Sequence, residues 1–414
     1  MLNIPFALID YKINDIFLLL KDLAVNRKTS QKENLIIRNI QNRFPNKKIE
    51  LLPSARLGFY LTLKKYFKKG DEIIFSSMSF PLYIKIAKQL DLKVRLVDVN
   101  QKDMNINEKE IERKIKKNTK GIVITHLFGY PCNLAKITKI TKKYNLKLIE
   151  DCAQSFGTYY KKKHTGNFGN VGIFSTSLVK IPTTLGGGIL VTEDENLIKL
   201  VKLFKKKIPF SIVIYLKYFL KNFISLLNSK PLLYTLFSSK IFSLLNRFNP
   251  RLYRKIIYSG MGLNNKFNPL ERINLGKYQL TFGQKQFVNH ISMKNKCKKN
   301  SLYIINKLKN YKNISFLKYD NKVNWNYQYL IIKVENGLEN FSKKMFNNNI
   351  HSMEENVWDC LDYNYKIENH NDNFKNTKLN SSKLIRIQNS PSLKKKDLDL
   401  IIKAIKNSSK NKIK

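Results

Sequence analysis

The sequence predicts an α/β protein with a mostly parallel central sheet, helices on both faces, a smaller C-terminal α/β lobe and an inserted helical hairpin. Three observations lead to this fold class. Short β-rich runs alternate with helix-like segments from about residue 49 to residue 206, an apolar segment without acidic residues then interrupts the pattern, and helix and strand patterns return from about residue 274. Alternation of strands with helices favours parallel pairing, because the crossover helices cover both faces of the sheet.

The predicted elements of the first lobe follow one another closely. Strand-like runs occupy residues 72–75, 94–97, 122–125, 147–149, 171–174 and 188–191, and helix-like segments occupy residues 82–90, 108–117 and 134–144. Ligands of such sheets gather beyond the carboxyl ends of the strands. We therefore expect the functional side chains in the loops that follow these strands.

Residues 207–262 differ in composition from the rest of the chain. No Asp or Glu occurs from residue 196 through residue 270, whereas Lys and Arg recur. In the run IPFSIVIYLKYFLKNFISLLNS, polar residues recur at helical spacing: Lys217, Lys221, Ser225 and Asn228. Pro231 suits the first turn of a second helix. We predict three units, residues 1–206, 207–262 and 263–414, with a last amphipathic helix near residues 396–405.

Composition limits the class of protein. The chain has 414 residues, and 43% are hydrophobic, which is too apolar for a disordered chain and ample for a large core. The four cysteines (Cys132, Cys152, Cys297 and Cys360) form no CxxC pair. We therefore expect no disulfide framework, no metal site and a cytoplasmic location. The start shows no signal-peptide pattern, and no charge-free apolar run reaches the roughly 20 residues of a membrane span.

The formal net charge of +46 has three interpretations. It suits nucleic-acid binding, attraction to anionic lipids or phosphorylated substrates, or a compositional bias without a partner. The lysines are scattered along the whole chain, whereas nucleic-acid readers concentrate theirs in one patch, so we expect no nucleic-acid partner. In residues 207–262, apolar faces and regular lysines predict peripheral contact with the inner face of a membrane. Packing on the protein itself or across a dimer is the alternative.

Two residues between Thr125 and Thr192 suit one cofactor chemistry. Asp151 follows the strand-like run 147–149, and Lys180 follows the run 171–174 and precedes a glycine turn. Pyridoxal 5'-phosphate (PLP) requires a lysine for a Schiff base, an acid against its pyridine nitrogen and backbone N–H groups for its phosphate. Alone, such an Asp is usually a turn or cap residue and such a Lys a surface charge. The order and spacing of these residues carry the prediction.

The segments EDCAQSFG and GNFGNVGIFS, and a lysine followed by TTLGGG, occur in this order. Together they resemble the DegT-type PLP-dependent sugar aminotransferases, which have the type I aminotransferase fold. The resemblance covers residues 51–203 and resumes weakly from about residue 268. It implies that Asp151 is the pyridinium partner and Lys180 the Schiff-base lysine. It also implies that Gln154 lies by the cofactor's phenolic oxygen and that Ser175 hydrogen-bonds the phosphate.

Two upstream segments and one strand end extend the resemblance. PSARLGF, residues 53–59, matches the family's phosphate-binding helix start, with Ser54, Ala55 and Arg56 at its N–H groups. Arg56 stands where the family often has Thr, and its guanidinium suits a phosphate. SSMSFPLY points to Phe80 as the residue that stacks on the pyridine ring, and THLFG places His126 near the cofactor. A solvated helix face for Arg56 and a core position for Phe80 are the alternatives.

The sequence departs from the family pattern in one place and matches it loosely in another. Gly186 stands where the family often has Glu after the lysine, which bears on substrate identity. Arg272, Ile273 and Asn274 match loosely an Asn-x-Arg segment that the family donates across its dimer interface. Related sugar dehydratases have His in place of the lysine, so Lys180 favours amino transfer.

The resemblance implies a homodimeric aminotransferase. Its substrates would be an amino donor, glutamate in most of the family, and a nucleotide-linked keto sugar of surface-polysaccharide or lipopolysaccharide biosynthesis. The absent Glu and the insert keep open a catalytically altered, membrane-associated PLP-binding homologue with a regulatory or scaffold role. Net charge alone keeps a nucleic-acid binder open.

Overall fold

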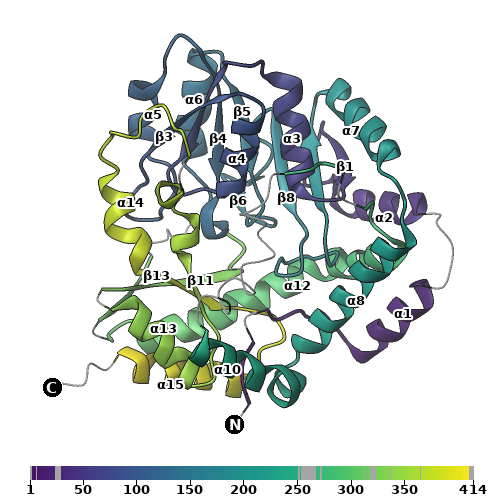
Figure 1. Cartoon of the computed structure of the whole chain (residues 1–414), viewed down its shortest axis with the longest axis vertical. Coiled ribbons are helices and arrows are strands. Elements are labelled where there is room, and N and C mark those ends of the chain that lie inside the picture. The colour runs from purple at the N-terminus through teal and green to yellow at the C-terminus, as the bar shows by residue number, and fades with distance from the viewer. Residues whose placement is uncertain are drawn as a thin grey trace.

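The computed structural model describes residues 2–5, 7–23, 29–249, 252, 267–270, 273–311, 313–317, 323–335, 337–363 and 365–409. Two sheets organise these residues, one in the upper and one in the lower half of Figure 1. We call the part around the larger sheet the large lobe and the part around the smaller sheet the small lobe. The long helix α12 (Lys277–Leu308) contacts α1 (Ile13–Leu23) and α2 (Ser30–Gln41) at one end of the chain and α15 (Lys395–Ser409) at the other.

The larger sheet has seven strands in the order β1-β9-β8-β5-β4-β2-β3. They are β1 (Lys48–Leu52), β2 (Glu72–Ser76), β3 (Lys93–Val97), β4 (Thr119–Thr125), β5 (Lys147–Asp151), β8 (Val171–Ser175) and β9 (Gly188–Thr192). Neighbours from β8 through β3 pair in parallel, whereas β9 runs antiparallel to both β1 and β8. The predicted fold class, α/β with a mostly parallel central sheet, is confirmed.

Helices cover both faces of this sheet. They are α2, α3 (Ala55–Tyr66), α4 (Pro81–Gln89), α5 (Glu108–Lys114), α6 (Leu134–Lys143) and α7 (Glu195–Lys207), with a short hairpin of β6 (Tyr159–Tyr160) and β7 (Lys163–His164) beside them. Successive residues of β2 point to opposite faces, as in any strand. Phe75 packs with residues of α3, α4 and α7, while Ile74 packs with residues of α5 and α6. Because strands buried on both faces have nearly continuous apolar sequences, these strands could be predicted.

The smaller sheet has four antiparallel strands in the order β10-β11-β13-β12. They are β10 (Ile314–Phe316), β11 (Tyr329–Val334), β12 (Met353–Glu354) and β13 (Leu384–Gln388), with helices α13 (Leu338–Asn347), α14 (Lys375–Asn380) and α15 and the 3₁₀ turns η4 (Glu355–Trp358), η5 (Cys360–Asp362) and η6 (Ser381–Lys383). Ile4 and Leu8 from the start of the chain pack into the core of this lobe. The expected last amphipathic helix is α15.

The insert forms the helical hairpin that its composition predicts. It contains α8 (Ile212–Asn228), α9 (Pro231–Leu233), a π-helical turn (Tyr234–Ser238) and α10 (Ser239–Phe248). One face of α8 is buried: Asn222 donates to the Tyr278 hydroxyl of α12 at 3.0 Å, and the Tyr11 hydroxyl donates to the Leu226 carbonyl at 2.9 Å. Residues 250, 251 and 253–262 of the predicted insert lie outside the described residues.

No single described helix is both long and apolar enough to cross a membrane. Helices α7 and α8 reach the length and apolar composition of a membrane span only when they are taken together, and a bend of 105° separates them.

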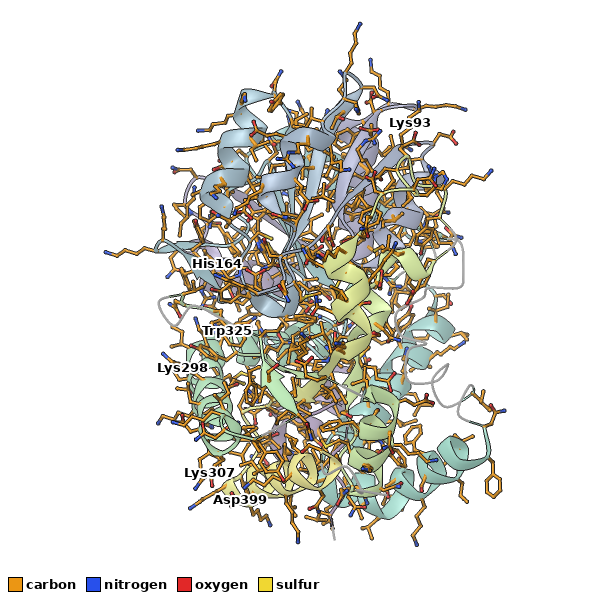
Figure 2. All side chains as sticks on the ribbon, turned by 90° about the vertical axis from the view of Figure 1, so that its left-hand side faces the viewer. Lys93, His164, Lys298, Lys307, Trp325 and Asp399 are labelled. Atoms are coloured by element: carbon orange, nitrogen blue, oxygen red, sulfur yellow. The ribbon has the colours of Figure 1, made fainter. Side chains whose placement is uncertain are left out.

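The basic residues are spread over the molecule. Lys93, Lys298 and Lys307 are exposed, and Figure 2 shows them projecting from the large lobe, from near the middle of the molecule and from the small-lobe end. The charge is thus distributed over both lobes, as the scatter of lysines in the sequence predicts.

Candidate active site

Asp151 is the last residue of β5 and is buried, with 2% of its surface exposed. Its carboxylate accepts hydrogen bonds from the Thr125 hydroxyl at 3.2 Å and from the Ala153 backbone N–H at 3.0 Å. Both donors are neutral, and no ion pair to Asp151 forms within the described part of the chain. Burial raises the pKa of Asp151, and the Ala153 hydrogen bond and the charge of Lys180 oppose this rise. The carboxylate therefore retains acceptor capacity for a cationic N–H group.

Lys180 lies in the loop that connects β8 to β9 and is half-buried. Its Nζ donates to the Tyr329 hydroxyl at 3.1 Å, and its charge acts on both Asp151 and Glu355. Strands β5 and β8 are parallel neighbours, so the loops after them leave the same edge of the sheet. The structure thus brings the two predicted catalytic groups to one place.

The N-terminus of α3 and the glycine turn meet at this edge. Ser54 caps α3, since its side chain accepts from the Leu57 N–H at 3.2 Å, and it forms a parallel bridge with Gly187. A Cβ atom at Gly188 would lie 2.6 Å from the Ala55 nitrogen, so only glycine lets the turn come this close. The first N–H groups of a helix, together with its dipole, form a site for an anion.

Arg56 and Ser175 lie near this helix end. Arg56, half-buried, is the second residue of α3, and its charge and that of Asp151 both act on the buried Tyr83. Ser175 is the last residue of β8, and its hydroxyl donates to the Ser177 hydroxyl at 3.2 Å. A guanidinium and a hydroxyl therefore accompany the backbone N–H groups of the helix start.

Phe80 and Gln154 come from two other loops of the same edge. Phe80 precedes α4 and contacts Tyr83 and Trp358, with ring centroids at 5.2 and 5.7 Å. Gln154 is buried, and its side-chain oxygen accepts from the Phe128 N–H at 2.9 Å. Phe80 is half-buried and packs against two groups of buried apolar side chains.

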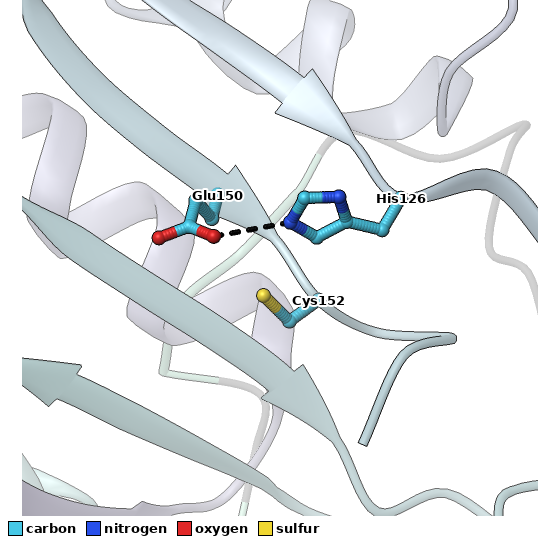
Figure 3. Close-up of side chains that lie close together, drawn as sticks. All are labelled: His126, Glu150 and Cys152. Atoms are coloured by element: carbon cyan, nitrogen blue, oxygen red, sulfur yellow. Dashed lines mark hydrogen bonds and ion pairs between the residues drawn. The ribbon is translucent and has the colours of Figure 1, made fainter. Parts of the chain in front are cut away.

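His126 is fully buried, and both of its ring nitrogens have protein partners. Nδ1 accepts from the Cys132 N–H at 3.1 Å, and Nε2 lies 3.1 Å from a Glu150 oxygen (Figure 3). This pattern requires the tautomer with hydrogen on Nε2, which donates to Glu150. The imidazole thus supports the end of β4, next to Asp151.

Glu150, His126 and Cys152 form a cluster of metal-ligand types whose ligand atoms lie within 4.8 Å of one another (Figure 3). The carboxylate of Glu150 also accepts backbone N–H bonds from Gly166, Phe168 and Gly169 at 2.6 to 2.8 Å. Burial would raise the pKa of Glu150, but the His126 and backbone hydrogen bonds outweigh it and lower the pKa. Burial also raises the pKa of the Cys152 thiol well above its usual value. The cluster holds the loop before β8 against β5, and we assign it no metal.

The small lobe adds residues that the sequence did not indicate. Besides Tyr329, the buried Glu355 and Arg386 form an ion pair with 3.0 Å between Nε and Oε1. The Arg386 guanidinium lies 4.5 Å from the centre of the Tyr329 ring. In the sequence, Tyr329 begins the apolar run YLIIKV and is indistinguishable from a core residue of a strand. Only the approach of the two lobes places it at Lys180.

Two further places where the sequence was compared with the family pattern are Gly186 and the segment 272–274. Gly186 has φ of 144°, a backbone conformation that L side chains rarely adopt, so Glu is disfavoured at this position. Arg272 lies outside the described residues. The Asn274 side chain donates to the Lys205 carbonyl at 3.0 Å.

This donor set fits PLP. A buried carboxylate without a close cationic partner suits the pyridine nitrogen, an amine suits the aldehyde, and a helix N-terminus with Arg56 suits the phosphate. At Gly188 a side chain would collide with the backbone at the start of α3, so the turn meets this helix end through backbone alone.

Comparison with known proteins identifies a related family and a shared fold. Residues 54–207 match the model of the DegT/DnrJ/EryC1/StrS aminotransferase family. The GDP-perosamine synthase of Escherichia coli O157:H7 is 36% identical over 129 residues, which are 31% of this chain and 35% of that enzyme. The chain spans half or less of the length of the curated relatives that it matches.

Two solved structures share the fold over nearly the whole chain. Helicobacter pylori PseC, an aminotransferase involved in the biosynthesis of pseudoaminic acid, has a TM-score of 0.75 at 16% identity, with 98% of this chain and 99% of that chain covered. The E. coli GDP-4-keto-6-deoxy-D-mannose-3-dehydratase, solved with bound hydrated PLP, has a TM-score of 0.72 at 16% identity, with 98% and 100% covered.

The described residues therefore have the type I aminotransferase fold, and the resemblance that the motifs indicated is confirmed over residues 54–207, which match the DegT/DnrJ/EryC1/StrS aminotransferase family.

Proposed function

We propose that the protein is a PLP-dependent aminotransferase that moves an amino group, with glutamate as donor, to a nucleotide-linked keto sugar. One observation carries this proposal. The buried Asp151 ends β5, the amine of Lys180 comes from the loop after the neighbouring parallel strand β8, and the two groups interact electrostatically beside the N-terminus of α3. PLP, when bound, supplies the electron sink for the chemistry.

Each residue has a role that its surroundings permit. Asp151 would hold the proton on the pyridine nitrogen, and Lys180 would bond to the cofactor and move the proton of the substrate carbon. The phosphate would lie at Ser54, Ala55 and Arg56 of the α3 start, with the Ser175 hydroxyl beside it.

The remaining predicted residues would shape the site. Phe80 would stack on the ring from the loop after β2, and Gln154 would lie by the phenolic oxygen while it fixes Phe128. His126, whose ring is held by Glu150 and Cys132, would act by supporting the strand end rather than through a direct proton transfer.

Three findings support a nucleotide-linked keto sugar as the acceptor. The chain is similar in sequence to a GDP-perosamine synthase, and it shares the fold of PseC, an aminotransferase involved in the biosynthesis of pseudoaminic acid. The strong positive charge of the chain favours a phosphorylated substrate. The dehydratase shares the fold, so the fold alone leaves the reaction open. Lys180 favours amino transfer, since the related dehydratases have His at that position.

We further infer a cytoplasmic homodimer that acts in surface-polysaccharide or lipopolysaccharide synthesis. Members of the family that the sequence resembles complete their active sites across a dimer interface, which supports the dimer. The similarity to a GDP-perosamine synthase and to an aminotransferase of pseudoaminic acid biosynthesis supports the pathway. Sedimentation of the purified protein tests the dimer, and a single species with the mass of one chain would contradict it.

The cofactor and the reaction can be tested in sequence. Purified protein with PLP should show an absorbance band near 410–430 nm, a family expectation, which Lys180→Ala abolishes. Glutamate alone should remove the band, and a suitable nucleotide keto sugar should restore it with formation of an amino sugar. A panel of such sugars, followed by mass spectrometry, identifies the acceptor. An unchanged band after glutamate would contradict amino transfer and favour the PLP-binding regulatory or scaffold homologue.

We also infer that the insert docks on an anionic membrane surface. Leu216, Leu220 and Ile224 recur every four residues on α8 and are 45%, 57% and 48% exposed, so they form one apolar stripe. Lys217 and Lys221 lie next to this stripe and are exposed.

Helix α10 continues the exposed apolar surface with Ile241, Leu244 and Phe248. No acidic residue occurs from residue 196 through residue 270 to repel anionic headgroups. An apolar face flanked by lysines is the pattern of an interfacial helix.

Flotation with vesicles tests this second proposal. The protein should float with vesicles that contain phosphatidylserine, less with purely neutral vesicles, and not when Leu216, Leu220 and Ile224 are all replaced by Ser. The replacement Ser225→Ala on the same helix is the control. Equal flotation of the triple variant would contradict the proposal. A triple variant that changes from dimer to monomer in sedimentation would assign this face to the dimer instead.

A further inference from the structure

Four consecutive residues of the small lobe, Asn326 to Tyr329, lie against the loop that follows Asp151 and the loop that carries Lys180. They stand at the start of β11 and are all buried. We call them the bracing segment. Tyr327 has a left-handed backbone with φ of 56°, and its carbonyl accepts from the Asn389 side chain at 2.7 Å. The bend of the segment is therefore fixed from within the small lobe.

Asn326 holds the loop that follows Asp151. Its side-chain N–H group donates to the Gln154 carbonyl at 2.6 Å and to the Phe156 carbonyl at 3.2 Å. Its side-chain oxygen accepts from the Gln328 N–H at 3.1 Å, so it is tied to the next part of the segment. A Cβ atom at Gly129 would collide with Asn326, which shows how closely the loop after β4 approaches.

Gln328 holds the backbone on both sides of Lys180. Its side-chain N–H group donates to the Val179 carbonyl at 2.7 Å, and its side-chain oxygen accepts from the Ile181 N–H at 3.3 Å. One amide thus binds the peptide groups that flank the reactive lysine. Because Gln328 is 2% exposed, water cannot readily replace these bonds.

Tyr329 holds the amine itself. Its hydroxyl accepts from Lys180 Nζ at 3.1 Å, and its side chain is fully buried. Arg386 lies over its ring at 4.5 Å and pairs with Glu355, so the phenol has little freedom to move. The amine is thereby held at a fixed point between the two lobes.

We propose that Asn326, Gln328 and Tyr329 act as one positioning element that sets the Lys180 amine relative to Asp151. Asn326 fixes the loop after the carboxylate, Gln328 fixes the peptide of the lysine, and Tyr329 fixes the direction of its amine. The site therefore depends on contact between the lobes, although both proposed catalytic groups belong to the large lobe. The proposal rests on the proposed function in that Lys180 is the reactive group.

The test uses two variants with matched controls. Gln328→Met keeps the size of the side chain and removes both hydrogen bonds, and Tyr329→Phe removes only the hydroxyl. Gln286→Met and Tyr278→Phe are the controls, because Gln286 donates to the Asp10 carbonyl and the Tyr278 hydroxyl accepts from Asn222, both in contacts that do not involve Lys180.

The first readout is made on cofactor-free protein. The rate at which an amine-selective reagent modifies Lys180 is measured by peptide mass spectrometry and divided by the rate for the exposed Lys93. Loss of one hydrogen bond predicts a rise of about 2- to 10-fold in Tyr329→Phe, and loss of two predicts at least as large a rise in Gln328→Met. The rate in each control should not change. The second readout is the pH dependence of the visible band with PLP, which should shift in Tyr329→Phe.

Two outcomes would refute the proposal. If both variants melt at the wild-type temperature and leave the Lys180 rate and the band unchanged, the segment does not position the lysine. Equal changes in the controls would assign the effect to general loosening and would also refute it. Failure of wild-type protein to bind PLP would refute the proposed function alone, since the labelling of Lys180 does not use the cofactor.

Discussion

The loops around Asp151 and the helices of the insert are built in opposite ways. Around Asp151, buried polar groups are surrounded by partners: Glu150 alone accepts hydrogen bonds from three backbone N–H groups and from His126. In the insert, α8 buries a polar residue, Asn222, while Leu220 and Val213 are exposed at 57% and 72%. The first region is organised to hold chemical groups in place. The second keeps apolar surface in contact with solvent, which a monomer without a partner does not require.

The largest expected effect is on the free energy of unfolding, when buried and exposed leucines are replaced by Ala. Leu190→Ala in β9 and Leu226→Ala in α8 each remove a fully buried side chain and should lower the free energy of unfolding by about 2–5 kcal/mol. Leu220→Ala should change it by about 0.5 kcal/mol or less, because that side chain is already exposed. Urea denaturation measures all three. A cost at Leu220 equal to that at Leu226 would show that the outer face of α8 is covered in solution.

The next effect concerns the cofactor alone. Asp151→Asn removes the negative charge opposite the pyridine nitrogen and should weaken PLP binding by about 10- to 100-fold, the range for one hydrogen bond to a charged group. Fluorescence titration with PLP measures this. Asp397→Asn, at the start of α15, is the control because the Asp397 side chain accepts from the Lys394 N–H, away from the proposed site. Equal affinity of Asp151→Asn and wild type would contradict the assigned role.

Acid should affect both regions through buried histidines. Burial lowers the pKa of His164, beside the site, to about 3 and that of His351, against Tyr234 of the insert, to about 4. The folded chain then binds fewer protons than the unfolded chain below about pH 6.5, so stability is lost as the pH falls from there towards these values.

Each histidine contributes at most about 1.4 kcal/mol per pH unit in that window. Urea midpoints at pH 7 and pH 5 measure the loss, and His351→Asn should reduce it relative to wild type. An identical pH dependence in the variant would show that His351 titrates normally.

The smallest effect compares two ion pairs. Lys48 and Glu195 lie 3.0 Å apart with side chains 57% and 62% exposed, and a double-mutant cycle should give about 0.2–1 kcal/mol. Lys205 pairs with Glu50 at 2.7 Å with side chains 14% and 7% exposed, at the end of α7 that leads into the insert. Its coupling should be larger and less sensitive to salt. A larger coupling for Lys48 would reverse this part of the comparison.

Regular, locally determined features were predictable from the sequence. The runs 171–174 and 188–191 became β8 and β9 with one residue added to each, because both runs are buried and contain no polar side chain. Asp151 and Lys180 were predicted from the order and spacing of the segments around them, and the structure places them at the ends of neighbouring parallel strands. The helix of the insert was found from its polar stripe.

Features that depend on distant contacts were not predictable. Strand β1 was missed, since KIELL mixes charged and apolar residues and pairs only with β9 near residue 190. The sequence around Tyr329 and Gln328 does not indicate their role, because their partners Lys180 and Val179 lie 149 residues earlier in the chain. The role of Ile4 and Leu8 in the small-lobe core has the same cause.

The central claim, that Lys180 is the group that bonds to PLP opposite Asp151, has a direct measurement. Protein incubated with PLP is reduced with sodium borohydride, digested and examined by peptide mass spectrometry. The account predicts stoichiometric modification of the peptide that contains Lys180, and its loss in Lys180→Arg with only trace labelling elsewhere. Stoichiometric modification of another lysine, or undiminished total labelling in the variant, would contradict it.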